Sequence, residues 1–377
     1  MLYINKSNWH YVDLQRWILD KCSTNICVKT VTLKYNGITN LDKNIYKLDL
    51  IELDCSYNDL TILSDINKLT NLKKLNCSSN KLTKILNINE NLQTLYCDYN
   101  NLTELPDLYN IYTLFCNDNK LSKLPDNIFN INLCILYCDK NELINLPEIN
   151  KISELKTLNC TLNKIQNLPS TIFNLYNLQT FMCSFNNLTF LPKEIGKLIN
   201  LKIFFCTNNK LTTLPEELCN LLNLREFNCN DNKLIKLPKN INKLVNLNAL
   251  YCDYNNIIEL PIKIIYCNKL DFIQYNHNPI TYIQSAIKRF LYNIENINIF
   301  IDMQNVHNNM IQTSLFDSVN ILLEDDINLN LNLLDDDILT IDAKNILIKF
   351  IDDVIVEKML CMTFEELLIC IWNKIIC

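Results

Sequence analysis

The sequence is poor in the residues from which many catalytic and cofactor sites are built. It holds two glycines, three histidines and three alanines among 377 residues. The glycines, Gly37 and Gly196, stand far apart, which excludes a glycine-rich phosphate loop and the dinucleotide-binding fingerprint. The histidines share no local motif and no C-x-x-C pair occurs, so the spacings of zinc fingers and zinc proteases are absent. We therefore expect no cofactor and no metal.

Charge and hydropathy argue against two further classes of protein. The formal net charge is −6, and the sequence lacks the strongly basic stripe of a nucleic-acid binder. It also lacks a run of the ~18 apolar residues that a membrane span needs. Charged residues interrupt residues 1–27, which do not resemble a signal peptide. We expect a cytoplasmic monomer that binds neither nucleic acid nor membrane.

What the chain does have is an internal repeat. The segment LQTLYCDYNNLTELP at 92–106 returns as LNALYCDYNNIIELP at 247–261, which gives the template L-x-x-L-x-C-x-x-N-x-L-x-x-L-P. We number its positions from the first Leu, so that Cys stands at position 6 and Asn at position 9. The asparagine recurs twelve times, at residues 36, 58, 80, 100, 119, 141, 163, 186, 209, 232, 255 and 278. A period of this length is typical of a solenoid, in which each unit buries its apolar face against its neighbours.

The pattern resembles the leucine-rich repeat proteins, in particular the intracellular kind whose repeats continue L-P-x-x-I-x-x-L-x-N-L, as in LPKEIGKLINL at 191–201. The resemblance covers residues 28–283 and implies an α/β fold: a curved, horseshoe-shaped solenoid with a parallel β-sheet on its concave face. The Asn-rich composition is also similar to repeat proteins of giant DNA viruses and amoebae. If the chain is viral, we expect it in the host cytoplasm.

Two columns of polar and sulfur-containing residues are expected in the core. Leu, Leu and Cys at positions 1, 4 and 6 alternate along the predicted strand, so positions 4 and 6 point inward. A buried Asn at position 9 must be hydrogen-bonded, and its amide can both donate to and accept from neighbouring turns. In-register parallel strands point their Cβ atoms the same way, which suits disulfides poorly, so we predict reduced thiols. These cysteines are Cys55, Cys77, Cys97, Cys116, Cys138, Cys160, Cys183, Cys206, Cys229 and Cys252.

The outward positions 5 and 7, with position 8 at the rim, carry the candidate binding residues. They are Tyr96, Asp98, Tyr99, Phe115, Tyr137, Asp139, Met182, Phe185, Phe205, Tyr251, Asp253 and Tyr254. Exposed aromatic side chains flanked by acids favour a protein or peptide partner with basic and apolar groups. The alternative is that the tyrosines only coat the sheet and pack on one another.

The two ends break the repeat. Residues 1–27 are expected to form an N-terminal helical cap, and residues 284–377 a small, mainly helical module. The first helix of this module is expected over Ile287–Tyr292. Some bacterial effectors couple such repeats to a cysteine ligase with a C-x-D motif. An alternative function is therefore a substrate-recognition subunit or ubiquitin-ligase-like effector acting through this module. The C-x-D matches, at Cys116 and Cys229, fall in the predicted buried column, so we predict an interaction scaffold and not an enzyme.

Overall fold

The computed structural model describes residues 28–126, 128, 132–148 and 154–294. The chain divides into two compact units, Met1–Tyr292 and Asn293–Cys377, and nearly all of the described residues belong to the first. The predicted cap at 1–27 and most of the predicted module at 284–377 lie outside the described residues.

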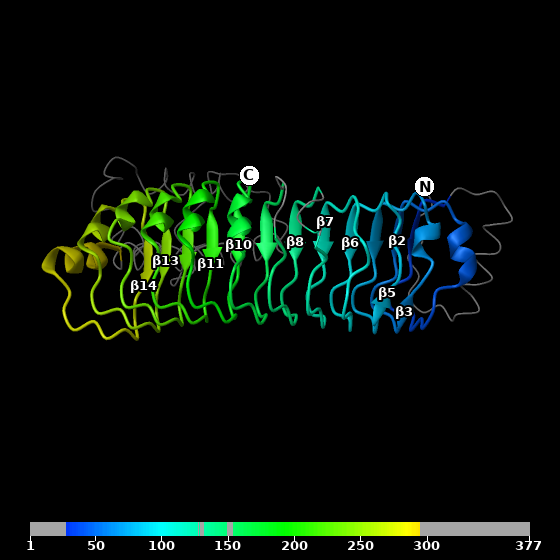
Figure 1. Cartoon of the computed structure of the whole chain (residues 1–377), viewed down its shortest axis with the longest axis horizontal. Coiled ribbons are helices and arrows are strands. Elements are labelled where there is room, and N and C mark those ends of the chain that lie inside the picture. Colours follow the sequence, from blue (N-terminus) through cyan, green and yellow to red (C-terminus); the bar gives the residue numbers. More distant parts are fainter. Residues whose placement is uncertain (1–27, 127, 129–131, 149–153, 295–377) are drawn as a thin grey trace, which may run out of the picture. The chain divides into compact units, whose positions relative to one another are not determined.

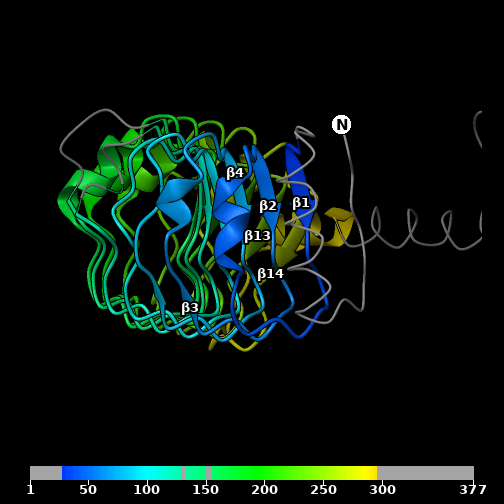
Figure 2. The same ribbon diagram turned by 90° about the vertical axis from the view of Figure 1, so that its right-hand side faces the viewer.

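One parallel sheet runs through the described part of the chain (Figure 1). It has twelve strands, and one comes from each predicted repeat. In order they are β1 (Thr30–Thr32), β2 (Glu52–Asp54), β4 (Lys74–Asn76), β6 (Thr94–Tyr96), β7 (Thr113–Phe115), β8 (Ile135–Tyr137), β9 (Thr157–Asn159), β10 (Thr180–Met182), β11 (Ile203–Phe205), β12 (Glu226–Asn228), β13 (Ala249–Tyr251) and β14 (Phe272–Gln274). Two further short strands, β3 (Ile62–Leu63) and β5 (Lys84–Ile85), come from two successive repeats and pair with each other in a separate parallel sheet. Figure 2 looks along the row of strands, so that successive turns of chain overlie one another.

The register places equal template positions side by side. Leu95 of β6 pairs with Leu114 of β7, which pairs with Leu136 of β8, and all three are fully buried. The core therefore grows by one identical layer per repeat, with each layer covered by the next. Phenylalanine fills position 4 in three successive repeats, and the buried rings of Phe181, Phe204 and Phe227 stack at centroid distances of 5.6 and 5.5 Å.

Short 3₁₀ helices lie on the return path of many turns. They are η1 (Lys43–Lys47), η2 (Ile66–Lys68), η3 (Ser170–Asn174), η4 (Lys193–Lys197), η5 (Glu216–Asn220), η6 (Ile241–Lys243) and η7 (Ile262–Tyr266). Pro192 and Pro215 immediately precede η4 and η5, with φ of −64° and −69°. The fixed φ and missing N–H of proline suit a position just outside the helix, where no intrahelical donor is needed. Both prolines therefore stand on the turn that follows a strand, at the start of the return path.

The described chain ends in an α-helix over residues 285–294. Its buried side chains, Ile287, Leu291 and Ile294, recur at helical spacing. This confirms the helix expected over Ile287–Tyr292. No helix in the described ranges is long and apolar enough to cross a membrane.

Candidate functional site

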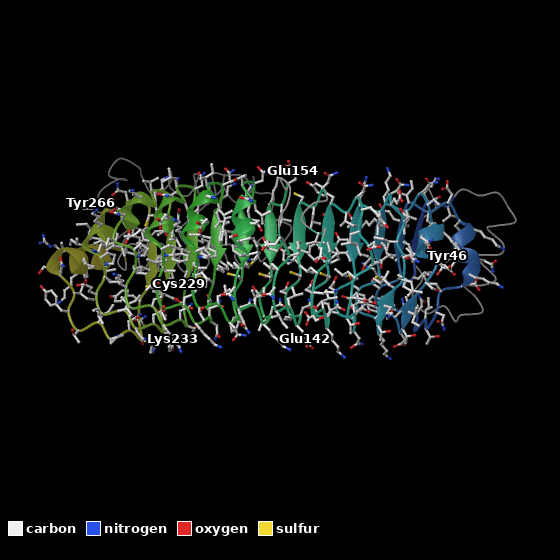
Figure 3. The ribbon with its side chains drawn as sticks, in the orientation of Figure 1. Tyr46, Glu142, Glu154, Cys229, Lys233 and Tyr266 are labelled. Atoms are coloured by element: carbon white, nitrogen blue, oxygen red, sulfur yellow. The ribbon has the colours of Figure 1, made fainter. Side chains whose placement is uncertain are left out.

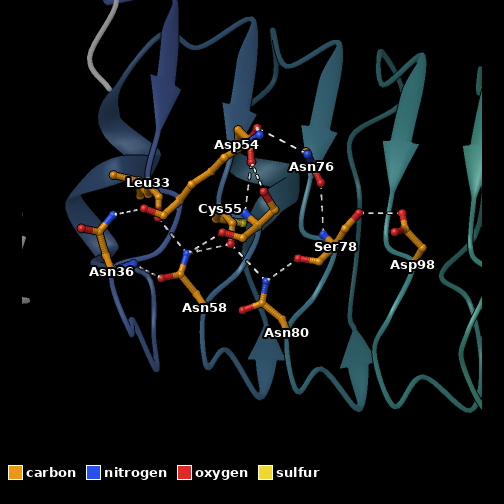
Figure 4. A network of polar contacts seen from close by, with 11 residues as sticks. Leu33, Asn36, Asp54, Cys55, Asn58, Asn76, Ser78, Asn80 and Asp98 are labelled. Atoms are coloured by element: carbon orange, nitrogen blue, oxygen red, sulfur yellow. Dashed lines mark hydrogen bonds and ion pairs between the residues drawn. The ribbon is translucent and has the colours of Figure 1, made fainter. Parts of the chain in front are cut away.

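A column of asparagines at position 9 ties each repeat to the one before it (Figure 4). The Nδ2 of Asn80 donates to the carbonyl oxygens of Cys55 and Cys77 at 3.0 and 3.1 Å, and its Oδ1 accepts from the backbone N–H of Leu60 at 3.0 Å. The same bonds recur along the array, and the side chain of Asn186 makes them to Cys160, Cys183 and Ile165. The prediction that these amides are buried and structural is confirmed for ten of the twelve, whereas Asn36 and Asn278, in the first and last repeats, are half-buried.

The ten cysteines at position 6 form a second buried column, and every cysteine of the described residues is free and buried. The thiol of Cys77 donates to the carbonyl oxygen of Tyr96 in the next repeat at 3.3 Å. Burial raises the pKa of the Cys160 thiol to about 12 and raises those of Cys116 and Cys229 well above the ordinary value. Because the thiolate is the nucleophile, burial and a raised pKa disfavour nucleophilic chemistry at these cysteines, including Cys116 and Cys229 of the two C-x-D matches.

Position 8 follows each strand by three residues and adopts the left-handed conformation. Twelve residues there have φ between 50° and 57°, and none of them is glycine. This conformation turns the chain away from the sheet and leaves the side chain at the rim, where Tyr99, Phe185 and Tyr254 are 52%, 45% and 52% exposed. The rim position expected for these three residues is where the structure places them. A non-glycine residue in this region costs roughly 1–2 kcal/mol, which the surrounding hydrogen bonds must offset.

The exposed face of the sheet carries a stack of aromatic rings across β6, β7 and β8. Tyr96 and Phe115 are 5.1 Å apart between ring centroids, and Phe115 and Tyr137 are 4.6 Å apart and nearly parallel at 5°. All three occupy position 5 and are paired in register. Each side chain is half-buried, because its faces cover its neighbours while its edge meets solvent. Mutual packing and exposure therefore coexist in this aromatic ladder, which we define as Tyr96, Phe115 and Tyr137.

Three carboxylates border the aromatic ladder at the ends of the same strands. Asp98 accepts from the Ser78 hydroxyl at 2.6 Å, and Asp139 accepts from the Asn159 amide at 2.9 Å. Burial raises the pKa of both carboxyl groups above the ordinary value, and the negative charge of Asp118 adds to the rise.

The third carboxylate already holds a cation. The Nζ of Lys140 lies 3.1 Å from Asp118 and 5.9 Å from the centroid of the Tyr99 ring. Lys140 was not among the expected site residues. Its position 8, directly after Asp139 and in the column of Asp118, is the signal that could have identified it.

The remaining expected residues lie farther along the sheet. Met182 and Phe205 are half-buried neighbours in register on β10 and β11, and the half-buried Tyr251 packs on Phe272 at 5.2 Å. Asp253 differs from the others, because it is 8% exposed and accepts the backbone N–H of Asn276 at 2.6 Å. The Asp253 carboxylate binds the backbone of the turn in the next repeat, so it contributes little negative charge to the exposed face. In the described ranges no group of three His, Cys, Asp or Glu side chains is placed to hold a metal ion.

Comparison with known proteins addresses the fold. No family model and no curated protein matches the chain, whereas many solved structures do. The functional domain of InlJ from Listeria monocytogenes, described as including a cysteine ladder, is 29% identical, with a TM-score of 0.59 over 68% of this chain and 55% of that one. YopM, a leucine-rich effector protein from Yersinia pestis, is 24% identical, with a TM-score of 0.56 over 71% of this chain and 70% of that one. The plant peptide hormone receptor RGFR1, in complex with RGF2, is 21% identical, with a TM-score of 0.54 over 67% and 48% of the two chains.

The fold is that of a leucine-rich repeat protein. The chain matches about half the length of the InlJ domain and of RGFR1. The similarity is therefore one of the repeat solenoid, and it does not extend to the whole of either protein. The InlJ domain is described as including a cysteine ladder, and the present chain has a column of buried cysteines of its own, at position 6. Its aromatic ladder stands on the sheet face of that solenoid.

Proposed function

We propose that this leucine-rich repeat protein is an interaction scaffold that binds a protein or peptide partner on the exposed face of its sheet. The observation that carries the proposal is the aromatic ladder of Tyr96, Phe115 and Tyr137, held in a fixed stack by in-register pairing. Rigid aromatic side chains give a partner large contact area at small entropic cost, and they are enriched among the residues that dominate binding energy. Met182 and Phe205 offer a second apolar contact farther along the same face.

The charges of this face indicate the chemistry of the partner. Positions 3, 5, 7 and 8 carry more carboxylates than amines. Apart from the buried Asp253, the acids are Glu52, Asp54, Asp98, Asp118, Asp139, Glu226 and Asp231, and the lysines are Lys34, Lys74 and Lys140. Two of the lysines are already paired, Lys34 with Asp54 and Lys140 with Asp118, both at 3.1 Å. Asp98 and Asp139 accept hydrogen bonds from neutral donors, and a basic group of the partner beside the ladder would complement their charge.

The test removes the ladder and leaves the spine intact. A triple variant, Tyr96→Ala, Phe115→Ala and Tyr137→Ala, should lose the partners that the full chain captures from a lysate, while its circular dichroism stays close to that of the parent and its thermal transition, lowered by the lost ring packing, remains cooperative. The matched control truncates three exposed aromatic residues away from the sheet, Tyr109, Phe190 and Tyr282, and should keep every partner. Full capture by the ladder variant would contradict the proposal.

We further propose a cytoplasmic, monomeric chain that is not an enzyme. The free, buried cysteines and the L-P-x-x-I continuation of the intracellular repeat type support this placement. The alternative ligase-like activity would require Cys361, Cys370 or Cys377, which lie outside the described residues. A charged ubiquitin-conjugating enzyme should form no cysteine-dependent adduct with the full chain, and an adduct lost on Cys→Ser substitution at one of these positions would establish the alternative.

A further inference from the structure

Four exposed apolar side chains occupy one template position in four successive repeats. Tyr176, Ile199, Leu222 and Val245 each precede position 1 of the next strand by two residues, and they are 44%, 54%, 52% and 54% exposed. We call this set the apolar ridge. Scattered exposed apolar residues are ordinary, but a contiguous, aligned set is informative. In Figure 3, Glu154 and Tyr266, which likewise precede strands, lie along one edge of the row, and Glu142 and Lys233, which follow strands, lie along the other.

The backbone beneath the ridge has the same geometry in each repeat. The leucine before each ridge residue has φ near −76° and ψ between 55° and 67°, the conformation of an inverse γ-turn. The N–H of Ile199 accordingly donates to the carbonyl oxygen of Lys197 at 2.8 Å, and that of Leu222 to Asn220 at 2.9 Å. Recurring turns hold the ridge side chains in one orientation, which lowers the entropic cost of binding.

A second asparagine ladder binds the carbonyl groups of the ridge. Asn200, Asn223 and Asn246 donate from Nδ2 to the carbonyl oxygens of Tyr176, Ile199 and Leu222 at 2.8, 2.9 and 2.8 Å. The N–H and C=O groups of these ridge residues are thus both engaged within the protein. A partner cannot add a β-strand here through main-chain bonds, and it must bind through its side chains.

The segments that contain the ridge carry positive charge only, whereas the nearest carboxylates lie outside them: Glu154 accepts from the Asn177 amide at 3.3 Å, and Glu194 and Glu217 lie in η4 and η5. The four segments that contain it, 174–179, 197–202, 220–225 and 243–248, read NLYNLQ, KLINLK, NLLNLR and KLVNLN, and they hold no carboxylate. Lys197 and Lys243 precede the ridge, and Lys202 and Arg225 follow it. This is the reverse of the sheet face, where acids predominate. Two surfaces of opposite charge fit two different partners.

We propose that the apolar ridge docks an acidic amphipathic helix of a partner protein. A helix satisfies its own backbone and presents one apolar side chain per turn of about 5.4 Å, close to the strand spacing of roughly 4.8 Å in a sheet. Successive apolar residues of such a helix can therefore seat between successive ridge residues. Carboxylates beside its apolar face meet Lys197 and Lys243 on one side and Lys202 and Arg225 on the other.

The proposal is tested with a designed helical peptide that has leucine at every third or fourth position and glutamate beside the leucines. The control peptide carries lysine in place of each glutamate. Fluorescence anisotropy with the full chain should show binding of the acidic peptide only. The double variant Ile199→Glu, Leu222→Glu should weaken this binding by at least about tenfold. A control pair of equal exposure, Ile235→Glu and Ile258→Glu, lies on the edge that follows the strands and should leave it unchanged.

A charge-reversal variant tests the electrostatic half of the proposal. Lys197→Glu with Lys243→Glu should weaken the acidic peptide and strengthen the lysine peptide. The proposal is overturned if the acidic peptide does not bind, if both peptides bind equally, or if the ridge variant binds as the parent does. If the chain binds phosphatidylserine vesicles through the ridge and does not bind the acidic peptide, the ridge is a membrane-binding surface and the proposal of a helical protein partner is refuted. The triple ladder variant of the sheet face should keep the peptide, so the two proposals fail separately.

Discussion

Replacing one asparagine of the buried column, Asn186→Ala, tests how the repeats are held together. The amide of Asn186 donates to the carbonyl oxygens of Cys160, Cys183 and Ser184 at 3.0, 3.1 and 3.1 Å, and accepts from the N–H of Ile165 at 2.9 Å. The three carbonyl groups keep other donors, because neighbouring amides of the ladder also reach Cys160 and Cys183, and a backbone N–H reaches Ser184. The N–H of Ile165 loses the acceptor that this amide supplies.

The structure therefore sets the expected magnitude. A buried, unsatisfied N–H costs about 1–3 kcal/mol, and the lost donations add about 1 kcal/mol. We expect a loss of about 2–4 kcal/mol in the free energy of unfolding, measured by guanidinium denaturation followed by circular dichroism. The matched control is Asn200→Ala, whose exposed amide makes one bond, to the carbonyl oxygen of Tyr176, and it should cost less than about 1 kcal/mol. Equal losses in the two variants would refute the account of the buried column.

The isosteric variant Asn186→Asp adds a pH dependence with a defined sign. Its carboxylate can still accept from Ile165, but its second oxygen faces three carbonyl oxygens where the amide donated. Burial and these oxygens raise the folded-state pKa of the new carboxyl group above its unfolded value of about 3.9. The variant should be least destabilised near pH 4 and lose stability as the pH rises toward the folded-state pKa. A pH-independent loss would contradict this reasoning.

Other predictions follow from single sites. Leu162→Asn should stabilise the chain by roughly 1 kcal/mol in the same assay, because Leu162 holds a φ of 53° at an exposed position and asparagine tolerates that region; a destabilised variant would contradict the strain. Gly196→Ala should destabilise it by about 1–3 kcal/mol, since a Cβ there would lie 2.4 Å from the carbonyl oxygen of Glu217, and an unchanged midpoint would contradict that approach. The affinity of a basic partner, measured by calorimetric titration, should decrease as the pH is lowered and Asp98 and Asp139 become protonated. Because the pKa values of both carboxyl groups are raised, this decrease should begin at a higher pH than it would with ordinary carboxyl groups. The double variant Asp98→Asn, Asp139→Asn should abolish the pH dependence.

The sequence predicted the parts of the fold that every repeat shares. Position 4, the cysteine at position 6 and the asparagine at position 9 each recur with one environment, so periodicity alone predicted their burial, and for the asparagine also its bonds to neighbouring turns. The second asparagine ladder, which includes Asn200 and Asn223, was not recognised. It stands within the L-x-N-L continuation, where nothing in the pattern separates an amide that binds the neighbouring repeat from a solvated one.

The candidate surface was harder to predict than the spine. Position 7 looks uniformly outward in the template, yet Asp253 turns to bind the N–H of Asn276 while Asp98 and Asp139 remain beside the aromatic ladder. That difference depends on side-chain hydrogen bonds between particular neighbouring repeats. The pairing of Lys140 with Asp118 has the same origin, since it joins two repeats whose rim residues are unlike those elsewhere in the array.

Hydroxyl-radical footprinting of the chain with and without a captured partner tests the central claim most directly, because aromatic and sulfur-containing side chains report their own exposure. Tyr96, Phe115 and Tyr137 should lose reactivity in the complex, while Tyr109 and Phe190, which lie off the sheet, should keep theirs. A complex in which the three rings of the aromatic ladder react as they do in the free chain would contradict binding on the sheet face.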